Sequence, residues 1–290
     1  MVEAALSGVP LADLQRASER LTERYRSEIR DGGLHLSDDL SARAYLAARM
    51  PATYAAIRAS LASAAELIPD FKPRNMLDIG AGPGTAVIAA NDCWPGIADA
   101  ELIEASPAIR KWGEAFVSRL PLDSVRWHGD DLASIKPARK FDLVTLGYLL
   151  DELSRDAITA LIARLWDATA GVMIVIEPGT PEGFKRIAIA RKQLLAAGGV
   201  IVAPCTHHAA CPMAGGDWCH VKERVQRSRA HMHAKGASVP FEDEAYSYLA
   251  VARDGGAAGC RCGGRAVPPL RGWSVRLPAQ AAGPCSLQVC

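Results

Sequence analysis

One stretch of the chain limits its possible folds more than any other. Residues Met76–Thr85 read MLDIGAGPGT, an apolar segment that runs into a glycine-rich turn and then a helix start. Glycines let the backbone bend sharply and let a ligand approach closely. Glu104 follows about 20 residues after the turn, where a carboxylate can accept hydrogen bonds from ribose hydroxyls. The stretch predicts a nucleoside-type ligand bound at the end of a buried strand.

The spacing of the glycines favours one class of ligand. The turn has a G-x-G-x-G pattern, whereas a dinucleotide fingerprint has Gly or Ala where Thr85 stands, so S-adenosylmethionine (SAM) is favoured over NAD. A P-loop is excluded, because the chain has no G-x-x-x-x-G-K-[ST] motif. Asp130 follows the third predicted strand, where such folds place an acidic residue near the adenine, and its alternative role is to cap a helix. The predicted cofactor-binding residues are Asp78, Gly80, Gly82, Gly84, Glu104 and Asp130.

Short apolar segments alternate with amphipathic ones around this turn. This βαβ repetition predicts an α/β fold with a mainly parallel sheet and helices on both faces. Helical spacing of apolar residues before residue 70 predicts a helical lead-in. The strands are expected at Asn75–Ile79, Ala100–Ile103, Ser124–Trp127, Phe141–Leu146, Val172–Ile176 and Glu244–Arg253, and the later helices near 85–92, 107–119, 154–169 and 182–197.

Composition narrows the class of protein. A net charge of +1 gives no global attraction to nucleic acid, so any such binding must come from a local patch. No apolar run approaches the roughly 18 residues of a membrane span, and the first 20 residues contain three acidic ones and no signal-like apolar core. We therefore expect a cytoplasmic protein without membrane contact. Its eight cysteines then favour metal ligation over disulfides.

Three cysteines and a basic run form the second informative region. Cys205, Cys211 and Cys219 are separated by five and seven residues, unlike the paired C-x2-C of most zinc modules. Irregular spacing favours an iron–sulfur cluster, with zinc as the alternative. The basic run that follows is expected to be a helix that presents positive charge to RNA phosphates, through Lys222, Arg224, Arg227 and Arg229.

The sequence does not identify catalytic residues. Gly147–Glu152 is expected at the ligand-facing edge of the sheet, or simply as a loop and helix start. It has neither the Pro-Pro-aromatic loop of amino-methylating enzymes nor the nearby thiol that carbon-5 pyrimidine methylation requires. Methyl transfer therefore stays undecided at this point.

Six motifs together resemble the ribosomal small-subunit Rsm family, a methyltransferase-like group with bacterial members and mitochondrial relatives that help assemble the small ribosomal subunit. The motifs are Arg49–Ala55, Leu77–Gly84, Glu177–Thr180, Pro204–Pro212, Asp217–His220 and Arg224–Ser228. The resemblance implies a class I SAM-dependent methyltransferase (Rossmann-like) fold, contact with ribosomal RNA and, in mitochondrial relatives, a [4Fe–4S] cluster held by four cysteines. Cys205, Cys211 and Cys219 match the first three ligands. The fourth normally lies in a C-terminal segment.

The expected organisation follows from these patterns. We expect a helical region at 1–70, a methyltransferase-like domain at 71–198, a cysteine-rich metal-binding and basic element with a late strand at 199–253, and an atypical tail at 254–290. The tail has no acidic residue after Asp254. It is interpreted either as a natural disordered tail or as out-of-frame translation of a GC-rich gene.

Three functions remain open from the sequence. The first is a SAM-fold protein that acts on the small ribosomal subunit as assembly factor, rRNA methyltransferase or both. The second is a non-catalytic RNA-binding scaffold with a vestigial cofactor loop. The third is a small-molecule methyltransferase with a structural zinc.

Overall fold

The fold is built on one large, mainly parallel sheet. The computed structural model describes residues 1–26, 36–129, 137–205, 207–213 and 216–253. The sheet has eight strands in the order β3-β2-β1-β4-β5-β8-β6, and β7 also pairs with β8. Strands β1 to β5 are parallel, whereas β8 runs antiparallel to β5, β6 and β7. The strands are β1 (Asn75–Ile79), β2 (Asp99–Ile103), β3 (Ser124–His128), β4 (Phe141–Gly147), β5 (Thr169–Pro178), β6 (Val200–Ala203), β7 (Val221–Gln226) and β8 (Phe241–Ala252).

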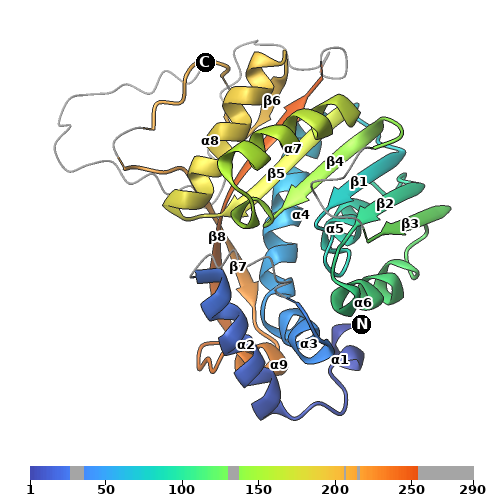
Figure 1. Cartoon of the computed structure of the whole chain (residues 1–290), viewed down its shortest axis with the longest axis vertical. Coiled ribbons are helices and arrows are strands. Elements are labelled where there is room, and N and C mark those ends of the chain that lie inside the picture. Colours follow the sequence, from blue (N-terminus) through green and yellow to red (C-terminus); the bar gives the residue numbers. More distant parts are fainter. Residues whose placement is uncertain (27–35, 130–136, 206, 214–215, 254–290) are drawn as a thin grey trace.

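Helices cover both faces of the sheet (Figure 1). Helices α4 and α5 pack on one face, and α7 and α8 pack on the other. The helices are α1 (Val2–Ala5), α2 (Leu11–Arg26), α3 (Asp39–Ala48), α4 (Met50–Leu67), α5 (Thr85–Cys93), α6 (Pro107–Val117), η1 (Leu150–Glu152), α7 (Arg155–Ala168), α8 (Pro181–Ala196) and α9 (Arg229–Ala234). The predicted Rossmann-like α/β class is confirmed.

Polar side chains fix where several helices begin. Asp38 accepts a hydrogen bond from the Ser41 backbone N–H at 2.8 Å, and the Asp38 N–H donates to the Ser41 hydroxyl at 3.2 Å, which completes a capping box for α3. At α6 and α8 the Ser106 and Thr180 hydroxyls accept from the Ile109 and Gly183 N–H groups, and a proline follows each cap in the first turn. These caps hold α6 and α8 at the sheet edge where strands β2 and β5 end.

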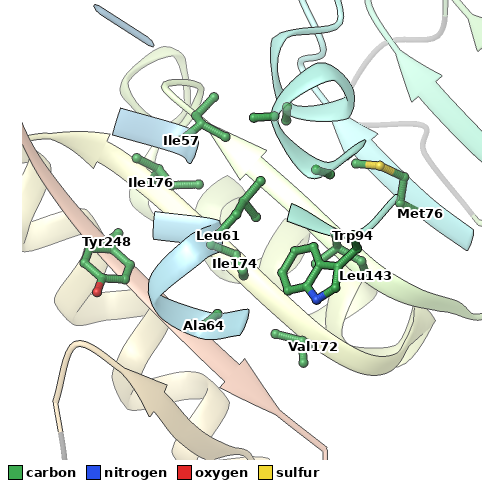
Figure 2. Packing of buried hydrophobic residues seen from close by; sticks show 14 of the residues in the cluster. Ile57, Leu61, Ala64, Met76, Trp94, Leu143, Val172, Ile174, Ile176 and Tyr248 are labelled. Atoms are coloured by element: carbon green, nitrogen blue, oxygen red, sulfur yellow. The ribbon is translucent and has the colours of Figure 1, made fainter. Parts of the chain in front are cut away.

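Side chains on β5 show how one strand serves both faces. Val172, Ile174 and Ile176 face α4 and belong to one buried cluster, whereas the alternate residues Met173 and Val175 belong to the cluster under α7 and α8. Figure 2 shows the first cluster, in which α4 lies against the sheet. A fully buried aliphatic side chain contributes roughly 1.5–3 kcal/mol. Burial on both faces explains why β5 has a continuous apolar sequence.

The late strand predicted at Glu244–Arg253 is β8, which begins at Phe241, whereas the strands β6 and β7 beside it were not predicted. β8 pairs with β5 along residues 172–178, and its other edge is shared by β6 and then β7. We call β7, α9 and Phe241–Tyr246 of β8 the β7–β8 extension. It runs from the sheet to α2, where α9 packs against α2 and α3 (Figure 1).

The prediction of a basic helix after the cysteines is wrong for the first half of the segment. Val221–Gln226 is a strand, in which Val221 and Val225 are buried while Lys222 and Arg224 are exposed. This period of two, rather than a helical period, follows from pairing with β8. Only Arg229–Ala234 is helical, as α9.

The sheet also crosses the expected boundary at residue 198, because β6 and β8 complete the same sheet as β1–β5. The tail at 254–290, together with four of the cysteines, lies outside the described residues. Among the described helices, none combines the length and apolar character that a membrane crossing needs.

Candidate functional site

A cavity of about 440 Å³ opens at the carboxyl ends of the parallel strands. Its wall includes residues that directly follow β1, β2, β4 and β5. The strand order reverses between β1 and β4, so the chain leaves these two neighbouring strands in opposite directions. Open α/β sheets bind ligands at such a switch point. The glycine-rich turn within Met76–Thr85 therefore lies at the position where a ligand is expected.

All three glycine positions of the turn have a backbone conformation that favours glycine. Gly80, Gly82 and Gly84 have φ angles of 68°, 54° and 76°, in the left-handed region that favours glycine. A Cβ at Gly84 would lie 2.4 Å from Cγ2 of Val117, whereas one at Gly82 would have no neighbour within 4 Å. Gly80 and Gly82 line the cavity. The turn is therefore packed from behind and open toward the cavity at Gly82.

Glu104 lies beside this turn, as the sequence predicts. One carboxylate oxygen accepts from the Gly82 N–H at 2.8 Å, and the other accepts from the Ser106 N–H at 2.7 Å. Burial raises the pKa of Glu104, and these two hydrogen bonds oppose the rise. Each carboxylate oxygen has a further lone pair. Glu104 can therefore shape the turn and still accept hydrogen bonds from a ligand hydroxyl in the cavity.

The other predicted cofactor residues lie elsewhere. Asp78 is 2% exposed and accepts a hydrogen bond from the Thr145 hydroxyl at 2.7 Å, so it supports the turn from within the sheet rather than lining the cavity. Burial raises its pKa to about 7. Gly84 begins α5 and is also absent from the cavity wall. Asp130 lies outside the described residues.

The chain after β4 contributes polar side chains that the sequence left undecided. Tyr148 has a φ of 57°, which is strained for a residue with a side chain. Its hydroxyl donates to Oε1 of Glu244 on β8 at 3.1 Å. Glu152 also lines the cavity. Burial, together with Asp151, Glu104 and Glu177, raises the pKa of Glu152 to about 7.

A buried ion pair supports the same loop from behind. Glu177, at the end of β5, is 0% exposed and lies 2.7 Å from Nε of Arg186 on α8. Its other oxygen accepts from the backbone N–H groups of Leu149 and Leu150 at 3.2 Å and 3.0 Å. These bonds fix the chain after β4. The Glu-Pro-Gly-Thr turn was visible in the sequence, but the hydrogen bonds from Glu177 to the chain after β4 were not.

The N-terminal helices form part of the cavity wall. Tyr25 of α2, Tyr45 of α3, and Arg49 and Thr53 around the start of α4 line it, and the Arg49 guanidinium lies 5.1 Å from the centre of the Tyr25 ring. The sequence predicts these helices but not their place at the site, since helical periodicity does not show which end of a sheet a helix covers. The motif Arg49–Ala55 contributed to the family resemblance but did not place these residues at the site.

The cysteine segment connects β6 to β7. Arg191 of α8 donates to the backbone oxygens of His207 and Ala209 at 3.1 Å and 2.7 Å, and the Ser247 hydroxyl donates to the Cys219 carbonyl at 2.7 Å. Burial raises the pKa of the Cys219 thiol to about 11, with further increases from Cys205 and Cys211. The three thiols therefore lie close enough to interact electrostatically. Within the described ranges, no three His, Cys, Asp or Glu side chains are arranged to bind a metal ion.

The predicted RNA-binding side chains differ in their surroundings. Arg224 pairs with Asp243 at 2.8 Å, and both side chains are exposed. Arg227 lies 2.9 Å from the largely buried Glu242. Lys222 and Arg229 are exposed to solvent. Two of the four expected RNA-binding side chains are thus paired with carboxylates of β8. These carboxylates lie more than ten residues after their partners in the sequence.

Comparison with known proteins identifies the family. Residues 39–290 match the family model described as mitochondrial small ribosomal subunit Rsm22. The chain belongs to the Rsm22 family. It is also 26% identical over 187 residues to the human mitochondrial ribosome assembly protein METTL17, a match that covers 58% of this chain and 40% of that protein. This Rsm22-family chain therefore aligns with less than half of its human relative.

Solved structures with a similar fold are methyltransferases. The magnesium protoporphyrin IX methyltransferase of Synechocystis, with bound SAM, has a TM-score of 0.46 at 15% identity, covering 85% of this chain and 100% of that one. The N-methyltransferase NodS of Bradyrhizobium japonicum, with S-adenosyl-L-homocysteine (SAH), has a TM-score of 0.45 at 13% identity, covering 83% and 99%.

Proposed function

We propose that this Rsm22-family chain binds SAM in the cavity and takes part in small-ribosomal-subunit assembly. The observation that carries the proposal is the open glycine turn at Gly82 with Glu104 bound to its backbone, inside a cavity at the β1/β4 switch point. Glu104 would accept hydrogen bonds from the ribose hydroxyls. Gly80 and Gly82 would let the ligand approach the backbone.

The SAM site is tested by calorimetry with SAM and SAH. We expect measurable binding of at least one of them by the wild type, and none by Gly82→Arg, because a long side chain at Gly82 would fill the cavity. Gly8→Arg is the matched control: Gly8 also has a positive φ, 77°, and open space around it, but lies in the turn after α1. No heat and no thermal shift with either ligand at millimolar concentration would reject the site and favour a vestigial loop.

Membership of the Rsm22 family and the similarity to METTL17, a ribosome assembly protein, support a ribosomal partner. Co-sedimentation of the purified protein with isolated small subunits tests this part. We expect the protein to migrate with the small subunit and not with the large one. If it stays in the unbound fraction at low salt, a small-molecule substrate becomes the better explanation of the cavity.

Methyl transfer to ribosomal RNA is a second candidate function. It is favoured by the polar groups of Tyr148 and Glu152, which line the same cavity as the glycine turn. Glu152 has a pKa of about 7, so at neutral pH its carboxylate can remove a proton from the RNA group that accepts the methyl. Incubating small subunits with radiolabelled SAM would show label in their RNA. Absence of label alongside normal SAM binding would leave the assembly role alone.

A metal cluster at the cysteine segment is the third part of the proposal. Three thiols that lie close enough to interact, in a segment whose backbone is bonded by Arg191 and Ser247, fit a soft metal in their chemistry, because a bound cation would favour the thiolate form of each ligand. Cys205, Cys211 and Cys219 would supply ligands to an iron–sulfur cluster, with the fourth outside the described residues. Such a cluster would link β6 to β7 and stiffen the loop between them.

Iron, zinc and sulfide analysis after anaerobic purification tests the cluster. We expect iron and sulfide in the wild type and less of both in Cys211→Ser, with Cys93→Ser as a control because Cys93 lies on α5. One equivalent of zinc without iron or sulfide would reject the cluster and leave a structural zinc.

A further inference from the structure

The wall of the cavity contains more negative than positive side chains. The carboxyl groups that line it are those of Glu104, Asp151, Glu152, Glu182 and Glu244. Two guanidinium groups, from Arg49 and Arg186, oppose them. Ion pairs hold one group of each sign, since Arg186 lies 2.7 Å from the buried Glu177 and Glu182 lies 2.6 Å from Lys185, and this leaves the other four carboxyl groups facing Arg49. The lining therefore favours a cationic ligand.

Aromatic rings add to this preference. The side chains of Tyr25, Tyr45 and Tyr148 line the same cavity, and the faces of aromatic rings attract cations. Arg49 shows this contact within the protein, since its guanidinium lies over the Tyr25 ring. Carboxylates and tyrosine rings together are the usual surroundings of an organic cation.

Two of the carboxyl groups are placed where the sulfur end of the ligand would lie. Glu104 at the end of β2 would hold the ribose, so the rest of the ligand extends across β1 toward the end of β4. There Glu152 lies on η1 and Glu244 accepts the Tyr148 hydrogen bond. Asp151, Glu104 and Glu177 raise the pKa of Glu152, after burial, and a positive ligand nearby would offset that repulsion.

SAM and SAH differ at this end alone. SAM has a positively charged, methyl-bearing sulfonium, whereas the sulfur of SAH is a neutral thioether. Resting on the proposed SAM site, we propose that the carboxylates of Glu152 and Glu244 make the cavity select SAM over SAH. The protein then stays loaded with the methyl-bearing form and releases the demethylated one.

Calorimetry of the full chain with SAM, SAH and sinefungin tests this selection. Sinefungin has an amine in place of the methyl sulfonium, so it keeps the positive charge without the methyl group. We expect SAM and sinefungin to bind about tenfold more tightly than SAH, which corresponds to about 1.4 kcal/mol. Equal affinities for all three ligands would overturn the inference while the SAM site stands. No binding of any of them would overturn both.

Two variants assign the selection to the named residues. Glu152→Gln and Glu244→Gln should each weaken SAM and sinefungin while leaving SAH nearly unchanged, so the affinity ratio falls toward one. Glu114→Gln, an exposed carboxyl on α6 outside the cavity, is the matched control and should keep the tenfold ratio. Melting curves of the unliganded proteins show that each variant is folded. Folded variants with a wild-type ratio would overturn the role of these carboxylates.

Discussion

The acidic side chains of the cavity and of the β7–β8 extension have opposite surroundings. Burial raises the pKa values of Glu152 in the cavity wall, and of Asp78 and Glu177 behind that wall, to about 7, and Arg186 only partly opposes this at Glu177. In the extension, burial would also raise the pKa of Glu242, but hydrogen bonds from His231, Lys235 and Arg227 lower it well below its usual range.

The difference indicates what each region is built for. Carboxyl groups without enough cationic partners destabilise the folded protein at neutral pH, and such groups gather at sites that bind ligands. A carboxylate that accepts hydrogen bonds from two cationic side chains and an imidazole stabilises the fold once it is ionised. The cavity therefore keeps unbalanced charge for a ligand, whereas the extension uses charge to hold α9 against the sheet.

The largest expected effect comes from removing the centre of the extension. Glu242→Gln would leave Arg227, Lys235 and the buried His231 without their common partner, at present 2.9, 2.6 and 3.1 Å away. Breaking a buried ion pair from one side costs about 3 kcal/mol, at the lower end of the range because Arg227 and Lys235 keep some contact with water. Urea unfolding measures this loss. If Glu242→Gln left the stability unchanged, the charges of the β7–β8 extension would not stabilise the fold, and this difference from the cavity would disappear.

The second prediction concerns the sign of the pH dependence at the cavity. Burial raises the folded-state pKa of Asp78 to about 7, above the ordinary aspartate value of 3.8. Its contribution to stability is therefore fully present below pH 4 and is lost as pH rises through 7. Asp78→Asn removes this loss, so the fall in unfolding free energy between pH 5 and pH 8 should shrink by on the order of 2 kcal/mol.

Thermal and urea unfolding of both proteins at the two pH values provide the measurement. Thr145→Val is a useful control, because it removes the hydroxyl that bonds to Asp78 but keeps the titrating carboxyl. An identical pH dependence in wild type and Asp78→Asn would show that the carboxyl is not held in its neutral form.

The sequence predicted the cavity end of the sheet well because local patterns determine it. Positive φ angles at Gly80, Gly82 and Gly84 leave a distinctive spacing, and Glu104 follows at the distance set by one βαβ unit. The wall formed by Tyr45 and Arg49 could not be predicted, since its position depends on how helices pack over the finished sheet.

The extension was predicted poorly because its interactions are long-range. The run from Val221 to Lys235 looks strongly basic when read alone. Its partners Glu242 and Asp243 follow a reversal of the chain, and only the pairing of β7 with β8 brings them opposite Arg224 and Arg227. Counting the basic residues of one segment therefore overestimates the net positive charge of the surface that the folded segment forms.

The third prediction concerns RNA affinity and follows from that pairing. Lys222 and Arg229 are exposed, whereas Arg227 is tied to Glu242, so Lys222→Gln with Arg229→Gln should flatten the salt dependence of binding to small-subunit rRNA. Each lost phosphate contact lowers the slope by roughly 0.7 to 0.9. Filter binding over a salt series measures the slope.

Arg227→Gln is the informative comparison for that experiment. It should lower stability more than the double variant does, and it should leave the slope of the folded protein close to wild type. A larger change in slope for Arg227→Gln than for the double variant would mean that the arginine leaves Glu242 to contact RNA. The extension would then have a binding role in place of a structural one.

The smallest effect on stability is expected at Asp243, the neighbour in sequence of Glu242, where the largest effect is expected. Asp243 pairs with Arg224 at 2.8 Å, as closely as Glu242 pairs with its own partners, but both members of the pair are exposed. Solvent screens exposed pairs, and the Arg224 guanidinium keeps its contact 4.3 Å from the centre of the Phe241 ring when Asp243 is changed. Asp243→Asn should therefore leave the urea midpoint unchanged within error, in contrast to Glu242→Gln. A drop similar to that of Glu242→Gln would show that desolvation does not distinguish these neighbours, and that the whole strand edge acts as one charge network.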